Sequence, residues 1–98
     1  MAFKLAWTLQ ARDDLGDIVR FIATDNPTAA EILGYSLISR VDSLERFPLL
    51  GRMVPEVGNQ TIREIVFRPY RIIYRVNEEQ QLLTILRIWQ GARGEPVL

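Results

Sequence analysis

The chain has 98 residues, 48% of them hydrophobic, and its 12 basic and 12 acidic side chains balance to a net charge of zero. This length suits one domain with one core, and the composition excludes a disordered chain. Because cysteine and histidine are both absent, disulfides, thiolate catalysis and the usual zinc sites are excluded, and we expect neither a metal nor another cofactor. A sequence pI near 6.2 also argues against a general nucleic-acid binder.

The first half of the chain predicts a strand followed by a helical hairpin. Residues 3–7 (FKLAW) form a short apolar run with an aromatic residue at each end, which is typical of a strand. Thr8 then occupies the position expected for a helix N-cap. Apolar residues recur at spacings of three and four within 11–22 and again within 30–44, which predicts two amphipathic helices. Asn26 and the proline after it predict a cap and a first helical residue, so the two helices form an antiparallel hairpin.

The second half predicts strands. Residues 48–59 contain prolines and glycines and are expected to form a loop. The three stretches that follow, 62–67, 71–76 and 82–89, are rich in β-branched and aromatic residues and are separated by short turns. They predict an antiparallel meander. The order β-α-α-β-β-β indicates a single α+β domain over residues 1–98, in which the N-terminal helical hairpin covers one face of a small antiparallel sheet.

Alternation along the strands predicts which side chains share a sheet face. In the last strand, Leu83 and Ile85 are expected on the same face as Arg87 and Trp89. We predict that arginines from neighbouring strands gather on the face that the helices leave uncovered, where they form a basic binding surface. An alternative is that these arginines only pair with acidic side chains. The predicted surface consists of Arg71, Arg75, Arg87 and Trp89, with Arg63 if the strand register allows.

Few residues are suited to catalysis. The acidic pairs at 13–14 and 78–79 are expected to diverge and to be solvated surface charge. Glu56 lies in MVPEVG, between a proline and a glycine. One interpretation is an RNA-cleaving set in which Glu56 accepts a proton and arginines stabilise the charge on phosphorus. The other is that Glu56 pairs with an arginine such as Arg52 or Arg63 and orders the loop.

Several stretches, in their order and spacing, resemble the RelE/ParE superfamily of bacterial toxins, often called plasmid stabilization proteins. They are WTxxARDDLxDI (7–18), DNPTAA (25–30), FPxLGRxVPE (47–56), IRE (62–64), YRIIYRV (70–76) and IWQGAR (88–93). The resemblance covers nearly the whole chain and implies the same α+β fold. It also implies a growth-inhibiting toxin of a type II toxin–antitoxin module, neutralised by a cognate antitoxin encoded in the same operon.

The resemblance implies two different targets. RelE-type members cut messenger RNA on the ribosome, whereas ParE-type members inhibit DNA gyrase by binding it. Glu56 and Arg71 match the loop acid and the strand arginine of the nucleases, but Gln90 stands where a histidine is expected. A glutamine amide exchanges no proton near neutral pH. If the chain acts by binding, the residues predicted to bind are those of the arginine surface together with the last motif: Arg63, Arg71, Arg75, Arg87, Trp89, Gln90 and Arg93.

We therefore expect a gyrase-binding toxin that is not an enzyme. The alternatives are a ribosome-dependent endoribonuclease, with Glu56 and Arg71 as its catalytic residues, and a toxin-fold protein that is no longer toxic and survives as a binding partner. The start of the chain has no apolar run of signal-peptide length, and no stretch of the sequence approaches a membrane span, so the cytoplasm is predicted.

Overall fold

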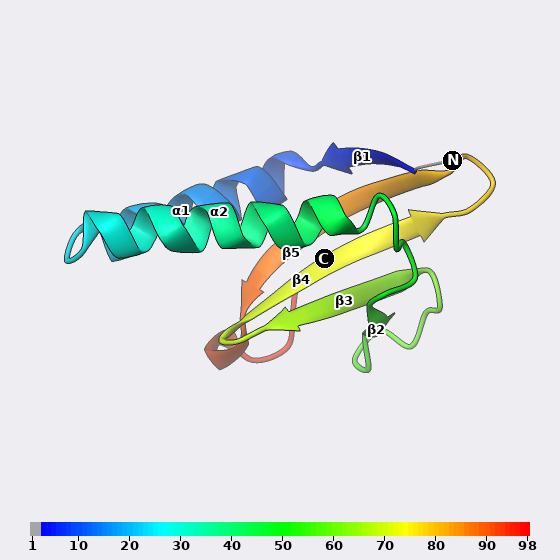
Figure 1. The fold of residues 1–98 in the computed structure, drawn as a ribbon. Coiled ribbons are helices and arrows are strands. Elements are labelled where there is room, and N and C mark those ends of the chain that lie inside the picture. Colours follow the sequence, from blue (N-terminus) through cyan, green and yellow to red (C-terminus); the bar gives the residue numbers. More distant parts are fainter. Residues whose placement is uncertain (1–2) are drawn as a thin grey trace.

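Two helices pack against a five-stranded sheet, and the α+β architecture expected from the sequence is confirmed (Figure 1). The structure is a computed structural model that describes residues 3–98, so residues 1 and 2 of the predicted domain lie outside the described range. The elements are β1 (Lys4–Trp7), α1 (Leu9–Ala23), α2 (Pro27–Ser43), β2 (Arg52–Met53), β3 (Ile62–Phe67), β4 (Tyr70–Asn77), β5 (Leu82–Gln90) and a 3-10 helix η1 (Gly91–Arg93).

The helical hairpin begins at the predicted caps. The Thr8 hydroxyl accepts a hydrogen bond from the Ala11 amide, and the Asn26 side chain accepts one from Ala29, so each helix start has one free amide satisfied. In Figure 1 the hairpin extends well past the end of the sheet. Within residues 3–98, neither helix has the length and apolar character needed to cross a membrane.

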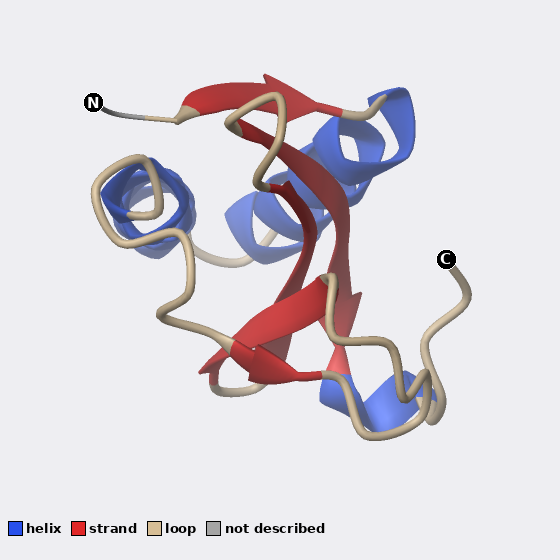
Figure 2. Ribbon diagram, turned by 90° about the vertical axis from the view of Figure 1, so that its right-hand side faces the viewer, coloured by secondary structure: helices blue, strands red, loops and turns tan. Residues whose placement is uncertain are grey.

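The sheet has the strand order β1-β5-β4-β3-β2 and is strongly twisted (Figure 2). The antiparallel meander β3-β4-β5 is confirmed. The prediction of a purely antiparallel sheet is wrong, because β1 pairs in parallel with β5 and makes the sheet mixed. The two-residue strand β2 pairs with β3 and was not predicted, since two residues show no alternation.

A bulge in β5 changes which side chains share a face. Tyr74 pairs with Ile85, but Ile73 pairs with Arg87, so Leu86 is an extra residue on β5. As a result Ile85 and Leu83 lie on the side of the helices, while Arg87 and Trp89 lie on the other side. The prediction that these four residues share one face is therefore wrong.

The sheet has a buried layer on each face. On the helix-covered face, Leu37 and Val41 of α2 pack with Ile72, Tyr74 and Ile85 in the main core. On the opposite face, here called the open face, a smaller cluster is formed by Val54, Ile62, Ile73 and Trp89. The open face is thus partly covered by the chain segment that follows β2 and by side chains of the sheet itself.

Candidate functional site

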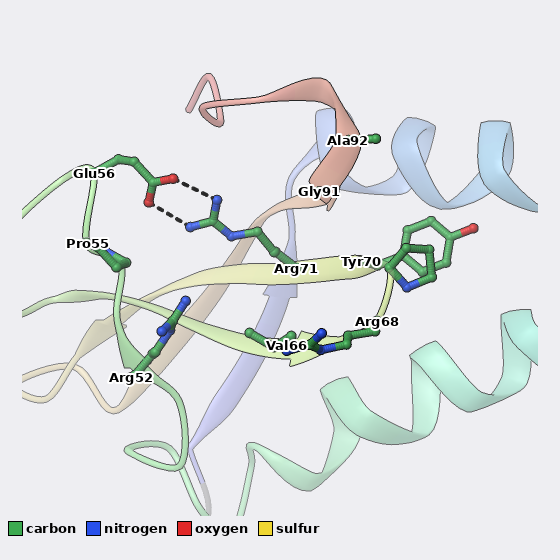
Figure 3. Close-up of a pocket in the computed structure, with 10 residues that line it drawn as sticks. Arg52, Pro55, Glu56, Val66, Arg68, Tyr70, Arg71, Gly91 and Ala92 are labelled. Carbon is green, nitrogen blue, oxygen red and sulfur yellow. Dashed lines mark hydrogen bonds and ion pairs between the residues drawn. The ribbon is translucent and has the colours of Figure 1, made fainter.

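A hollow of about 680 Å³ lies on the open face, between β2, the hairpin turn of β3 and β4, and the start of η1 (Figure 3). Arg71 of β4 points into its centre and toward Glu56. The hollow is lined by Arg52, Pro55, Glu56, Val66, Arg68, Pro69, Tyr70, Arg71, Gly91 and Ala92. Three cationic groups and one carboxylate therefore share its wall.

A buried carboxylate beneath the hollow holds two of the three arginines. The Glu64 side chain is fully buried, and its two oxygens accept hydrogen bonds from Arg71 Nε at 2.5 Å and Arg52 Nε at 2.8 Å. Strand pairing explains the arrangement, because β2 and β4 flank β3 and place Arg52 and Ile73 opposite Glu64. Both guanidinium groups are engaged through Nε, which leaves their terminal nitrogens for the hollow.

Glu56 approaches the same arginine from the loop after β2. Its two oxygens accept hydrogen bonds from Arg71 Nη1 and Nη2, each at 2.8 Å, which is the bidentate geometry of a strong arginine–carboxylate pair. The hydrogen bond from Arg71 lowers the pKa of Glu56 from 4.5 to about 2. In turn Glu56 and then Glu64 raise the pKa of Arg71. The second of the two sequence interpretations of Glu56, pairing with an arginine, is the one observed, but the partner is Arg71 and not Arg52 or Arg63.

The site is better suited to hold an anion than to transfer a proton. A general base works best with a pKa near the working pH, and a carboxylate with a pKa of about 2 is a weak base at pH 7. Tyr70 extends away from Arg71 in Figure 3, and burial raises the pKa of its hydroxyl. Gln90 pairs with Tyr70 and lines a separate hollow against α1, on the helix-covered face. The residue that stands in the histidine position is thus directed away from Glu56 and Arg71.

Comparison with known proteins identifies the family. A family model described as "ParE toxin of type II toxin-antitoxin system, parDE" matches residues 5–94. The chain belongs to the ParE toxin family. Toxin RelE2 of Caulobacter vibrioides is 35% identical to this ParE-family toxin over 91 residues, which cover 92% of the chain and 97% of the relative.

Solved structures support the same fold for the ParE-family toxin. A chain of the chromosomal ParDE toxin–antitoxin system from P. aeruginosa superposes with a TM-score of 0.76 at 23% identity, covering 91% of this chain and 96% of that chain. A chain of the toxin–antitoxin complex RelBE2 from Mycobacterium tuberculosis gives 0.68 at 20% identity, covering 92% and 99%. At these identities the likeness establishes the fold.

The predicted arginine surface of the ParE-family toxin is only partly assembled. The strand register confirms that Arg71, Arg75 and Arg87 share the open face. Arg63 does not join them, because it pairs with Tyr74 on the helix-covered face and donates to the Gly51 carbonyl at 2.8 Å. Arg75 is exposed, and within residues 3–98 it has no ion pair. The arginines of the open face in residues 3–98 therefore form no continuous patch of unpaired guanidinium groups.

Arg87 is held at the edge of the sheet by α1. Its Nε and Nη2 donate to Asp14 at 2.7 and 2.9 Å, and Asp14 also accepts the Ile88 amide at 3.0 Å. These contacts raise the pKa of Arg87. The expectation that both acids at 13–14 are solvated is therefore wrong for Asp14, which lies one residue further round the helix than Asp13 and faces β5.

Trp89 and Arg93 fix the C-terminal tail, residues 91–98. Trp89 is buried, and its indole nitrogen donates to the Gly94 carbonyl at 3.1 Å. The guanidinium of Arg93 lies 4.4 Å from the centre of the indole ring, and that of Arg87 lies 5.0 Å from it. Figure 2 shows the tail leaving the sheet on the side opposite α2. These residues hold the tail in place, so Trp89 is not a free contact surface.

Glu64 is the residue of this site that sequence reasoning missed. The sequence held a usable indication of its place. A turn of two residues joins β3 to β4 and pairs Phe67 with Tyr70, so the register places Val66 beside Arg71 and Glu64 on the same face. Among residues 3–98, no group of His, Cys, Asp and Glu side chains is arranged to hold a metal ion.

Proposed function

We propose that the chain is the toxin of a type II toxin–antitoxin module, that a cognate antitoxin encoded in the same operon neutralises it, and that it acts in the cytoplasm by binding DNA gyrase. The support is its membership of the ParE family and the fold that it shares with the ParDE toxin–antitoxin system of P. aeruginosa. In the superfamily that the sequence resembles, gyrase is the target of the ParE-type members.

The observation that favours a binding mechanism over a catalytic one is that Arg71 is already paired with two carboxylates. Its Nε, Nη1 and Nη2 all donate to carboxylates, and the Glu56 carboxylate beside it has a pKa of about 2. Gln90 faces the other side of the sheet, and the chain has no histidine. A cleavage reaction needs a group that takes a proton and a group that returns it, and among residues 3–98 neither group lies beside Arg71 with a pKa near neutral pH.

The test is a supercoiling assay with purified gyrase. We expect inhibition at micromolar concentrations of the chain, and we expect prior mixing with the antitoxin to abolish it. Unchanged supercoiling with a correctly folded chain would remove gyrase as the target.

A ribosome-dependent endoribonuclease is the second candidate. It is favoured by one observation, the direct contact between Glu56 and Arg71 at the edge of an open hollow. Primer extension on messenger RNA translated in the presence of the chain distinguishes the candidates, and we expect intact transcripts. Cleavage that is lost in an Arg71→Lys variant would establish the nuclease. If expression without antitoxin leaves growth unchanged, the chain is instead a non-toxic binding partner.

A further inference from the structure

The contact between Arg71 and Glu56 joins a residue of a central strand to a residue of an exposed loop. Arg71 lies on the central strand of the meander and is tied from below by the buried Glu64. Glu56 lies in a loop in which residues 55–61 are all exposed. The loop turns back through Gly58, whose φ is 67° and which has open space around it. An exposed loop opens locally at a lower free-energy cost than a central strand does, so the Glu56 contact is the one of the two carboxylate contacts of Arg71 that breaks more easily.

Without Glu56, the contact between Arg52, Arg71 and Glu64 carries a net positive charge. Arg52 and Arg71 contribute two positive charges, and the Glu64 carboxylate between them contributes one negative charge. One positive charge is therefore left at the contact, and Glu56 neutralises it. Arg68 lies at the other end of the hollow, beside the turn, in Figure 3. A single carboxylate balances the charge of this contact.

We propose that Glu56 is an internal occupant of an acceptor site for a carboxylate, and that an acidic side chain of the protein target replaces it on Arg71. The proposal rests on the proposed function, in which the target is a protein. The geometry defines the ligand class, because the terminal nitrogens of Arg71 bind two oxygens in one plane at 2.8 Å each. Glu64 is the positioning residue, since it fixes Nε of both arginines and so aims their terminal nitrogens at the hollow.

A Glu56 side chain that occupies the site lowers the apparent affinity of Arg71 for a carboxylate of another molecule. The measured dissociation constant equals the intrinsic one divided by the fraction of molecules in which the site is open. A partly exposed ion pair shifts such an equilibrium by up to about fivefold. Removing the Glu56 charge should therefore tighten carboxylate binding by about fivefold.

The experiment measures binding by the purified chain of 98 residues. The probes are a triglutamate peptide with blocked termini and inorganic phosphate, and in each titration the backbone amide resonance of residue 71, which every variant retains, is followed by NMR. The variants are Glu56→Gln, the double change Glu56→Gln with Arg71→Lys, and Glu79→Gln as the matched control. Glu79 is exposed in the turn between β4 and β5, so its substitution makes the same change in net charge away from the hollow.

We expect Glu56→Gln to bind the peptide about fivefold more tightly than the native chain, and Glu79→Gln to bind it as the native chain does. Arg71→Lys should remove the gain, because an ammonium keeps the charge but lacks the planar pair of donors. Equal affinities for the native chain and Glu56→Gln would overturn the proposal. Tighter binding of phosphate than of the peptide to Glu56→Gln would also overturn it, since the site would then serve nucleic acid or a nucleotide.

A parallel gyrase assay separates this proposal from the proposed function. Suppose that Glu56→Gln gains affinity for the peptide, while neither the native chain nor any variant inhibits supercoiling by gyrase. The acceptor site is then supported, and gyrase is the wrong target. If the native chain inhibits gyrase but Glu56→Gln gains nothing in peptide binding, the target is supported and the acceptor site is wrong.

Discussion

Glu64 is a charged residue in a position where apolar residues are usual. It is 1% exposed, and among residues 3–98 its ion-pair partners are Arg52 of β2 and Arg71 of β4, the strands on either side of β3. Removing one member of a buried ion pair leaves the other charge uncompensated, which costs roughly 3–5 kcal/mol in a dry interior. The Arg71 side chain is 14% exposed and that of Arg52 is 62% exposed, so water compensates part of this loss.

We therefore expect Glu64→Gln to lower the free energy of unfolding by about 2–4 kcal/mol, as measured by urea denaturation at pH 7. The control is Glu79→Gln, an exposed position at which a change within about 0.5 kcal/mol is expected. If both variants unfold at the urea concentration of the native chain, the buried pair contributes nothing to stability.

Glu56 should make stability depend on acid. Its pKa is lowered to about 2 in the folded chain, mainly by the hydrogen bonds from Arg71, against 4.5 in the unfolded chain. A carboxyl group with a depressed folded-state pKa stabilises the fold fully above its unfolded pKa. That contribution is lost as the pH falls from 4.5 through 2. It is of order 1 kcal/mol or less, because the Glu56 side chain is 29% exposed.

The measurement is a ¹³C NMR titration of the Glu56 carboxyl group, combined with urea denaturation of the native chain and Glu56→Gln at pH 7 and pH 3. We expect a midpoint near pH 2 and a native advantage that is smaller at pH 3 than at pH 7. Arg71→Gln should move the midpoint toward 4.5. A midpoint of 4.5 in the native chain would contradict the observed ion pair.

At the scale of elements, residues at the start of α1 provide hydrogen-bond partners for the edge of β5 beyond the point where β1 ends. β1 pairs with β5 only as far as Trp7 and Ile85, and Thr8 then bonds the Ile85 and Leu86 carbonyls. Beyond that point the Asp14 carboxylate accepts hydrogen bonds from the Ile88 amide and from Nε and Nη2 of Arg87. One helical side chain thus joins the helical hairpin to the strand that leads into the tail.

We expect Asp14→Asn to destabilise the chain by about 2 kcal/mol, since it replaces a charge-assisted pair that is mostly buried. The Ile88 amide should also exchange its hydrogen faster. Asp13→Asn is the matched control, because Asp13 is adjacent and exposed, and it forms no ion pair within residues 3–98. Equal stabilities of the two variants in thermal and urea denaturation would show that Asp14 does not hold the edge.

The regular elements were predictable because their signals are local. Thr8 and Asn26 mark helix starts by chemistry that acts over three residues, and the β-branched runs mark the meander. The parallel pairing of β1 was not predictable, because it joins residues about 78 positions apart. The bulge at Leu86 was also missed, since an extra residue in an apolar strand leaves no local mark, yet it reverses the face of every residue beyond it.

The site was predicted less completely than the fold. Arg71 and Glu56 were identified individually, but their contact depends on where a loop returns to the sheet. The short turn before Tyr70 would have been enough to place Glu64 on the same face as Arg71. Its burial was not predictable, because its second ion-pair partner, Arg52, lies on the unpredicted strand β2. An isolated charge in an alternating strand is usually exposed, and only the tertiary partners reverse that expectation.

At the scale of the whole molecule, the helical hairpin carries more apolar surface than the sheet is able to cover. Phe21 of α1 is 80% exposed, and Tyr35 and Ile32 of α2 are 68% and 63% exposed. The hairpin extends past the sheet in Figure 1, and the exposed fractions show that the rest of the described chain leaves these three side chains largely uncovered. Large exposed apolar groups on a small protein are typical of an interaction surface.

Under the proposed function, the antitoxin should therefore stabilise the chain strongly. A ligand that binds only the folded state at 100 times its dissociation constant adds about 2.7 kcal/mol. For a domain of this size that corresponds to a rise in Tm of roughly 10 °C or more. The measurement is the Tm of the chain alone and with the purified antitoxin, with a scrambled antitoxin peptide of equal composition as the control. The same Tm in all three samples would mean that the folded chain does not bind the antitoxin. A rise that the scrambled peptide reproduces would mean that the apolar hairpin binds without sequence specificity, and not as half of a cognate pair.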